Sequence, residues 1–377
     1  MRHDTESCLV MALLSWFAGS CGGQSSGGSP LDVSVCSAGW NVLLQSSQNV
    51  AIIDFAPRSP TGSGLTWSNG QLYFEYYDNV ERGHPVIASL STSGRGVTQI
   101  AAAASPYWWI EADQLTYIAG NYVLYGTLLD GSTQPIQLVD IGQGAADLNL
   151  SGFVLDTQAI YWISVQLATS DTVASWSLWQ ATRGTGQQLK LADMPLKSPA
   201  SGIGSSLTLT EDSVLVYDQD YAVLTGTLYK VPKTGGAPAV LPTPVSGWPI
   251  GIGSDGTSIW GETSGNRPQL WRATANGTAP SQVWPDLPRS LYFTDAWPDG
   301  SGGWYLVGWE PDNSSPSAKT YTSVWLLDGK GQASRLACAP LPFVASVYAG
   351  ATSSDSLYLL LNDGSHLNEE SIVSITR

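Results

Sequence analysis

One stretch decides the fold: Asp156-Thr157-Gln158-Ala159-Ile160-Tyr161-Trp162. It joins a short turn bearing Asp or Asn to an apolar strand, and this arrangement occurs seven times in the 377 residues. The strands are anchored by Leu72, Leu115, Ile160, Leu215, Ile259, Tyr305 and Leu357. Successive anchors lie 43 to 55 residues apart. Short strands and tight turns with this period predict an all-β fold, a seven-bladed β-propeller.

A second repeat predicts the content of each blade. Every anchor strand is followed by another apolar strand, and in the first six copies by a glycine-bearing turn and a last strand. Asn276-Gly277 and Asp328-Gly329 are hairpin signals, because primed turns need residues that tolerate positive φ. Each blade should therefore hold four antiparallel strands. The seventh copy reaches Arg377 without its fourth strand, and an open ring would leave an unpaired edge. We expect residues 49–55 to supply that outer strand and close the ring.

The first thirty residues do not belong to the repeat. Residues 9–18 form an apolar run of signal-peptide length, too short to span a bilayer as a helix. Small residues precede Cys21, and a Gly/Ser-rich stretch follows it. This pattern predicts a signal peptide over 1–20, lipidation of Cys21, a tether over 21–30 and one propeller domain over 31–377. Ala18 and Ser20 also suit an ordinary signal peptidase, so a secreted or periplasmic protein is the alternative.

Two cysteines within the propeller region suggest a covalent closure of the ring. Cys36 precedes the expected closing strand, and Cys338 lies in the expected outer strand of blade six. A disulfide between them would stabilise the fold by at most about 4–5 kcal/mol through loop entropy. Two buried thiols are the alternative.

Composition restricts the class of partner. The formal net charge is −15, and only 12% of the residues are charged. Affinity for nucleic acid is supplied mainly by Lys and Arg, so this balance argues against a nucleic-acid partner. The sequence has no basic cluster of the kind that binds anionic lipid. We expect membrane contact only through a lipid anchor, at the outer membrane.

Propeller geometry predicts where a ligand binds. The turns between strands one and two and between strands three and four share one face, the short-turn face. The connections from strand two to three and from strand four to the next blade share the opposite face, the loop face. The loop-face connections are expected to be long and irregular, and such loops usually carry binding residues. The candidate ligand residues are Asp78, His84, Trp108, Asp218, Asp220, Glu262, Trp309, Glu310 and His366.

Signals for catalysis are weak. His84 and His366 lie in loops of blades that become neighbours on ring closure, which would allow a metal pair, an acid–base pair or two solvated side chains. Gly23-Gln24-Ser25-Ser26-Gly27 matches a hydrolase pattern but lies in the tether without a strand-turn-helix context. Asp218 and Asp220 could bind calcium but lack the spaced oxygens of a calcium loop. We expect no cofactor, with calcium as the alternative.

Most aromatic residues are expected in the core, between blades. The exceptions lie at strand starts or in connections, where a ligand could stack on them: residues 107–109, Trp284, Trp297 and Trp309.

Two segments carry a resemblance to a known group of proteins. Both segments resemble the repeats of bacterial extracytoplasmic propellers. They are the stretch from Asp156 to Trp162 and residues 228–238, Leu-Tyr-Lys-Val-Pro-Lys-Thr-Gly-Gly-Ala-Pro. These are the TolB-like and YWTD-like propellers, which include lipoproteins of δ-proteobacteria. The resemblance covers most of residues 31–377, although the Tyr-Trp and Lys-Val-Pro elements are degenerate in blades one, two and seven. It implies fold and compartment and transfers no catalytic residue.

The sequence therefore predicts a non-catalytic binding or scaffolding propeller with a protein or an envelope glycan as its partner. The alternative is a hydrolase or lyase acting on glycans, whose carboxylates would come from Glu75, Asp78, Asp218 and Glu262.

Overall fold

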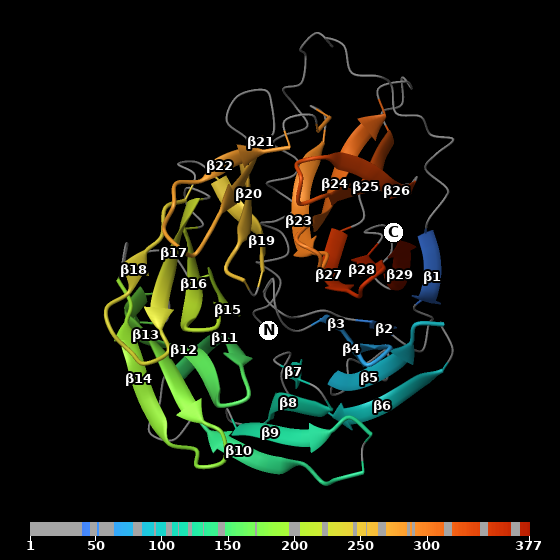
Figure 1. Ribbon diagram of the computed structural model, residues 1–377. Helices are drawn as coiled ribbons and strands as arrows, with labels where there is room; N and C mark the ends of the chain where they lie inside the picture. Colours follow the sequence, from blue (N-terminus) through green and yellow to red (C-terminus); the bar gives the residue numbers. More distant parts are fainter. Residues whose placement is uncertain are drawn as a thin grey trace.

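The protein is a ring of seven β-sheets, seen in a computed structural model (Figure 1). The structure describes residues 40–45, 51–52, 64–77, 85–93, 96–102, 108–111, 113–119, 123–130, 132–141, 148–169, 172–195, 204–220, 225–243, 247–253, 255–262, 269–284, 287–288, 291–312, 319–339, 346–362 and 370–377. All regular structure in these residues is β-strand, and no helix among them could cross a membrane. The predicted seven-bladed, all-β fold is confirmed.

Each blade is an antiparallel sheet, and in blades two to six the four strands follow chain order from the channel outward. Blade one holds β3 (Leu65–Ser68), β4 (Gln71–Tyr77), β5 (Pro85–Ser91) and β6 (Val97–Ala102). Blade two holds β7 (Trp108–Glu111), β8 (Gln114–Ala119), β9 (Val123–Leu128) and β10 (Ile136–Asp140). Blade three holds β11 (Leu148–Leu155), β12 (Ala159–Thr169), β13 (Thr172–Thr182) and β14 (Gln188–Asp193). Blade four holds β15 (Gly204–Leu209), β16 (Ser213–Asp220), β17 (Thr225–Pro232) and β18 (Ala239–Val240).

The remaining blades continue the pattern. Blade five holds β19 (Gly247–Ile252), β20 (Ser258–Glu262), β21 (Gln269–Ala273) and β22 (Ser281–Val283). Blade six holds β23 (Tyr292–Pro298), β24 (Trp304–Asp312), β25 (Lys319–Leu327) and β26 (Ala333–Ala339). Blade seven holds β27 (Ser346–Thr352), β28 (Ser356–Asn362) and β29 (Glu370–Thr376), with β1 (Trp40–Gln45) as its outer strand.

An N-terminal strand closes the ring as predicted, but it is not the expected one. β1 pairs with β29 along its length, whereas residues 49–55 were expected to do so. Within that range, β2 (Ala51–Ile52) pairs with Tyr76 and Tyr77 of β4 instead. The reason lies in blade one, where β3 covers only Gln71 to Phe74 of β4. The rest of the inner edge of β4 is free to take β2, so blade one has a composite inner strand.

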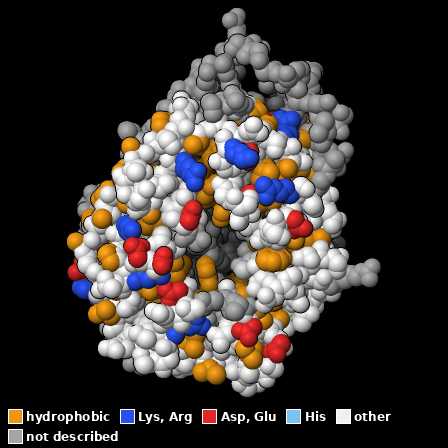
Figure 2. Space-filling model, in the orientation of Figure 1, with side chains coloured by type: hydrophobic (Ala, Val, Ile, Leu, Met, Phe, Trp, Pro, Cys, Tyr) orange, Lys and Arg blue, Asp and Glu red, His pale blue; other side chains and the backbone are white. Residues whose placement is uncertain are grey.

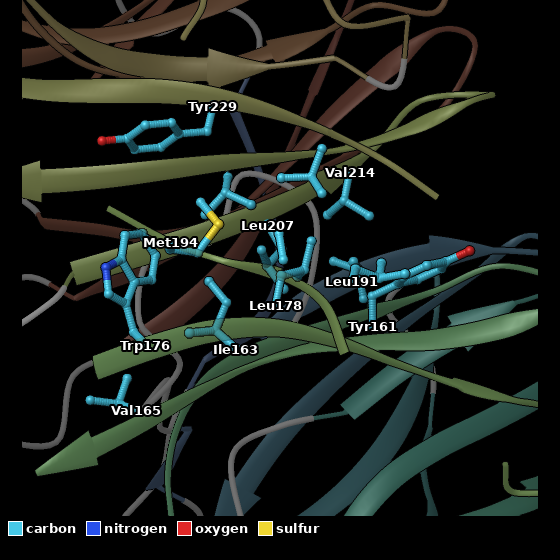
Figure 3. Packing of buried hydrophobic residues seen from close by; sticks show 14 of the residues in the cluster. Tyr161, Ile163, Val165, Trp176, Leu178, Leu191, Met194, Leu207, Val214 and Tyr229 are labelled. Atoms are coloured by element: carbon cyan, nitrogen blue, oxygen red, sulfur yellow. The ribbon is translucent and has the colours of Figure 1, made fainter. Parts of the chain in front are cut away.

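Apolar side chains from neighbouring blades pack into shared cores. Between blades three and four, Ile163, Trp176 and Leu178 face Leu207 and Val214 (Figure 3). Burial of such surface contributes about 25 cal/mol per Å², so each blade is stabilised mainly by its neighbours. The aromatic residues assigned to the core from sequence are buried or packed against it: Trp162, Trp179, Tyr229, Trp260, Trp271, Trp325 and Tyr358.

The predicted disulfide cannot be followed to both ends. Cys338 is completely buried in β26, in the outer strand of blade six as expected. Cys36, like Cys21, lies outside the described residues, so the pairing and the lipidation stay predictions.

Candidate ligand-binding site on the loop face

Second-to-third connections differ in length from blade to blade. In five blades the connection between the second and third strands lies outside the described residues. These connections are residues 78–84 in blade one, 221–224 in blade four, 263–268 in blade five, 313–318 in blade six and 363–369 in blade seven. In blade three, only Ser170 and Asp171 separate β12 from β13. In blade two, β8 and β9 are nearly as close in the chain. The expectation that all these connections are long is wrong for blades two and three.

Several predicted ligand residues cannot be placed by their side chains. Asp78, His84 and His366 lie outside the described residues, so the proposed histidine pair is not addressed. Asp220 and Glu262 end the strands β16 and β20 at the loop face, and only their backbone is described. Among the described residues, no group of three or more His, Cys, Asp or Glu side chains could hold a metal ion.

Blade six presents a stacked aromatic pair at its loop-face end. β23 starts at Tyr292, which pairs across the sheet with Trp309 of β24. The two ring centroids are 3.9 Å apart with an interplanar angle of 7°. Both side chains are partly exposed. Cross-strand aromatic pairs hold each other in place, so this pair is a rigid apolar surface at the inner edge of the ring.

A glycine next to Trp309 permits the close approach of the two strands. A Cβ atom on Gly308 would lie 2.3 Å from the Tyr292 carbonyl oxygen, so any other residue would push β23 away. The register shifts between Phe293 and Asp295, directly after this contact. The sequence Gly308-Trp309 therefore places the stack locally.

Glu310, the neighbour of Trp309, lies on the opposite side of β24, the side whose Leu306 packs against blade five. Its side chain is 2% exposed. Its Oε1 accepts a hydrogen bond from Trp325 Nε1 at 3.0 Å, and its Oε2 accepts one from the Arg335 guanidinium at 2.7 Å. The guanidinium also lies 4.8 Å from the centre of the Trp325 ring. Both carboxylate oxygens are thus engaged by side chains of blade six itself.

The carboxylates suggested for catalysis lie in different blade interfaces. Glu75 is 2% exposed and lies on the side of β4 whose Tyr73 packs against blade two. Asp218 is 9% exposed and lies on the side of β16 whose Val216 packs against blade three. Burial, and after it the charge of Asp218, raise the pKa of Tyr229. Blades two and three separate Glu75 from Asp218, so they do not form a catalytic pair.

Of the predicted stacking residues, Trp109 and Trp309 are partly exposed near the loop-face ends of their strands. Trp109 packs against the cores on both sides of blade three, and Tyr107 lies outside the described residues. Trp108 is 1% exposed between blades one and two. Trp284 is buried and donates a hydrogen bond from Nε1 to the Asp328 carbonyl at 3.3 Å. Trp297 is partly exposed but lies at the short-turn end of β23. Tyr292 was missed, because its pairing with Trp309 depends on a register that spacing does not give.

The short-turn face is tied together by charged side chains from adjacent blades. Lys233 of blade four lies 2.9 Å from Asp156 Oδ2 of blade three, and the Tyr161 hydroxyl donates to the same oxygen at 3.2 Å. Burial alone would raise the pKa of Asp156, but hydrogen bonds from Lys233 and backbone N–H groups bring it below its usual value. Arg377 of blade seven lies 3.3 Å from Asp299 Oδ2 of blade six.

The surface around the channel is of mixed charge. In the view of Figure 2, Lys and Arg are interspersed with Asp and Glu around a central hollow. Lys233 and Arg377 each have a carboxylate of the adjacent blade close by.

Comparison with known proteins supports the fold. No protein-family model and no curated protein matches this chain. The chain is similar to the structure of an oligogalacturonate lyase of Vibrio parahaemolyticus, with a TM-score of 0.63 and 11% identity over 92% of this chain and 95% of the lyase. The chain is also similar to the β-propeller domain of the Trilobed protease of Pyrococcus furiosus, with a TM-score of 0.54 and 10% sequence identity. The match covers 84% of this chain and 95% of that domain. An acylaminoacyl peptidase of Pyrococcus horikoshii matches with a TM-score of 0.56 and 13% sequence identity, over 82% of this chain and 51% of the peptidase. At these identities the likeness shows the propeller fold alone.

Proposed function

We propose that this protein is an extracytoplasmic, non-catalytic binding propeller that holds an envelope glycan on its loop face, over the Tyr292–Trp309 stack. The observation that carries the proposal is the stack itself, two parallel rings 3.9 Å apart and partly exposed. Such a surface offers apolar contact to a sugar ring at little cost in conformational entropy. The net charge of −15 favours a neutral glycan over a polyanionic one.

The environment of Glu310 supports binding without catalysis. A glycosidase needs two carboxyl groups about 5–5.5 Å or about 6.5–9.5 Å apart. Among the described side chains, Glu75, Asp218 and Glu310 lie in blades one, four and six, and Glu310 is engaged by Trp325 and Arg335. The alternative, a hydrolase or lyase, would have to draw on carboxylates elsewhere, such as Asp78 or Glu262.

The test is calorimetric titration with a panel of neutral oligosaccharides, together with oligogalacturonate, the acidic glycan in the name of the structurally similar lyase. We expect a neutral glycan to bind and Trp309→Ala to weaken its binding about tenfold, or about 1.4 kcal/mol. Trp179→Ala is the matched control, because Trp179 also stacks on a partner ring, Trp162, but in blade three. Equal binding by both variants would refute the site, and new reducing ends in the mixture would favour the enzyme.

The proposal includes a location, with the chain held at the outer membrane by a lipid on Cys21 after removal of residues 1–20. The support is the small-residue pattern before Cys21 and the Gly/Ser-rich stretch behind it. Intact-mass spectrometry of the mature protein should show the lipid and its loss in Cys21→Ser. A mature N-terminus at Cys21 without added mass would instead indicate a periplasmic or secreted protein.

A further inference from the structure

A row of side chains on blade six continues the aromatic stack outward across the sheet. Tyr292 of β23 pairs with Trp309 of β24, and Trp309 in turn pairs with Thr322 of β25. Residues directly opposite each other in an antiparallel sheet point to the same side. Tyr292, Trp309 and Thr322 therefore form one row near the loop-face end of the blade, which we call the blade-six row.

The blade-six row faces blade seven. Val307 lies two positions before Trp309 on β24, so both side chains are on the same side of the sheet. Val324 likewise lies two positions after Thr322 on β25. Both valines are buried in the core that blade six shares with blade seven, which includes Leu361 at the loop-face end of β28. Thr322 thus points toward a largely apolar interface between two blades.

The hydroxyl of Thr322 is buried without a hydrogen-bond partner. The residue is 3% exposed, and its Oγ1 forms no hydrogen bond with any of the described residues. Buried hydroxyls usually have a partner, because a hydroxyl that loses water without gaining one costs free energy of folding. Valine has a similar shape and would remove that cost. The choice of threonine therefore lowers the stability of the protein without ligand, and a role in binding would explain it.

We propose that Thr322 is a ligand contact, whose hydroxyl forms a hydrogen bond with a hydroxyl group of a neutral sugar stacked on the Tyr292–Trp309 pair. The inference rests on the proposed function, because it needs a glycan at this stack. The stack supplies apolar contact, which many rings of similar size would satisfy. The hydroxyl adds selection, since it both donates and accepts and carries no charge to attract an acidic sugar.

This contact predicts how the ligand is selected. The Thr322 hydroxyl is covered in the protein without ligand, so a sugar reaches it only by displacing the groups that cover it. The cost of that movement is offset when the hydroxyl gains its partner. A site built to bond a hydroxyl rejects an analogue that lacks it, because the buried polar group then stays unpaired. A hydroxylated sugar ring should therefore bind more tightly than an apolar ring of the same size.

Thr322→Val tests the contact when glycan binding and stability are measured on the same protein. Calorimetric titration uses three neutral probes, cellotetraose, mannotetraose and chitotetraose. For each probe that binds the parent, we expect Thr322→Val to weaken binding about tenfold and Thr322→Ser, which keeps the hydroxyl, to stay within about twofold. The urea midpoint of Thr322→Val without glycan should rise, because the unpaired hydroxyl is removed. A residue that served the fold alone would not give these opposite changes.

Thr208 provides a matched control. It is 1% exposed in β15 of blade four, and its Oγ1 also has no hydrogen-bond partner among the described residues. It pairs with Leu215, which is buried in the core shared by blades four and five. We expect Thr208→Val to raise the urea midpoint as Thr322→Val does, and to leave glycan binding unchanged.

The outcomes separate this inference from the proposed function. If Thr322→Val binds like the parent while Trp309→Ala binds more weakly, Thr322 is not a ligand contact and the glycan site stands. A fall in the urea midpoint for Thr322→Val, with a rise for Thr208→Val, would show that the Thr322 hydroxyl serves the fold, which also overturns the inference. If the parent binds none of the neutral glycans, the proposed function fails and the contact fails with it.

Discussion

The two ends of the propeller use charged side chains in different ways. At the short-turn face, Lys233 and Arg377 reach a carboxylate of the preceding blade, so the ion pairs join neighbours. At the loop-face end of blade six, Glu310 and Arg335 belong to the same sheet, so the ion pair supports one blade from within. The ion pairs at the short-turn face therefore join neighbouring blades, whereas the contacts of Glu310 hold Trp325 and Arg335 in place within one blade.

The largest expected effect comes from removing the carboxylate inside blade six. Glu310→Ala leaves the Trp325 N–H buried without an acceptor and Arg335 without its counter-charge. Loss of one partner of a buried pair costs about 3–5 kcal/mol, and we expect about 3 kcal/mol because Arg335 retains 21% exposure. Urea denaturation measures the free energy of unfolding.

A matched variant separates this role from a general effect of charge. Glu211→Ala removes an exposed carboxylate at the short-turn face, and we expect a change within about 0.5 kcal/mol. If Glu310→Ala were as mild as this control but abolished glycan binding, Glu310 would be a ligand residue as the sequence suggested. The contrast between the two faces would then be wrong.

The next effect concerns Asp299, whose carboxylate joins blades six and seven. Burial alone would raise its pKa, but hydrogen bonds from Ser301 and the Gly303 amide, and the charge of Arg377, hold it below its usual value. A lowered pKa in the folded state means stability that is present above the unfolded pKa of about 3.9 and is lost as the pH falls through the folded value. Asp299→Asn should therefore cost about 2 kcal/mol at neutral pH, the usual worth of hydrogen bonds to a charged group.

Denaturation between about pH 5 and pH 2 tests the sign of this effect. The free energy of unfolding of the parent should fall more steeply on acidification than that of Asp299→Asn, because the variant has no proton to bind at this position. Asp113→Asn changes an exposed carboxylate in another short turn and serves as the control. Parallel curves for parent and Asp299→Asn would show that Asp299 does not connect the blades electrostatically.

The sequence predicted the ring better than the site for a physical reason. The anchors are buried in every blade, so each copy must be apolar at the same place, and a period results. The closing strand was placed wrongly because β1 and residues 49–55 are both short and largely apolar, and the short reach of β3 leaves an edge of β4 to which β2 pairs. The spacing of the repeats does not show which of the two segments pairs with β29.

The candidate site depends on register, which the sequence does not fix. Trp309 and Glu310 are consecutive and were assigned the same role, yet successive strand residues point to opposite sides of a sheet. The stack needs Tyr292 opposite Trp309, which follows from a pairing shift after Phe293. The short connection of blade three escaped prediction because β12 and β13 extend to 11 residues each through polar positions.

The smallest effect compares two lysines of one short segment, Lys230-Val231-Pro232-Lys233. Lys233 pairs with Asp156 across two blades, and 21% and 25% of their side chains are exposed. Lys230 pairs with Asp212 within blade four, and 29% and 71% of their side chains are exposed. Exposed pairs contribute about 0–1 kcal/mol, so Lys233→Met should cost about 1 kcal/mol and Lys230→Met less than about 0.5 kcal/mol. When the denaturation is repeated in high salt, the loss of stability caused by Lys230→Met should shrink before that caused by Lys233→Met, since exposed charges are screened more strongly. If the two variants were equally destabilised, joining adjacent blades would give an ion pair no advantage over pairing within one, and the short-turn face would owe its cohesion to the apolar cores alone.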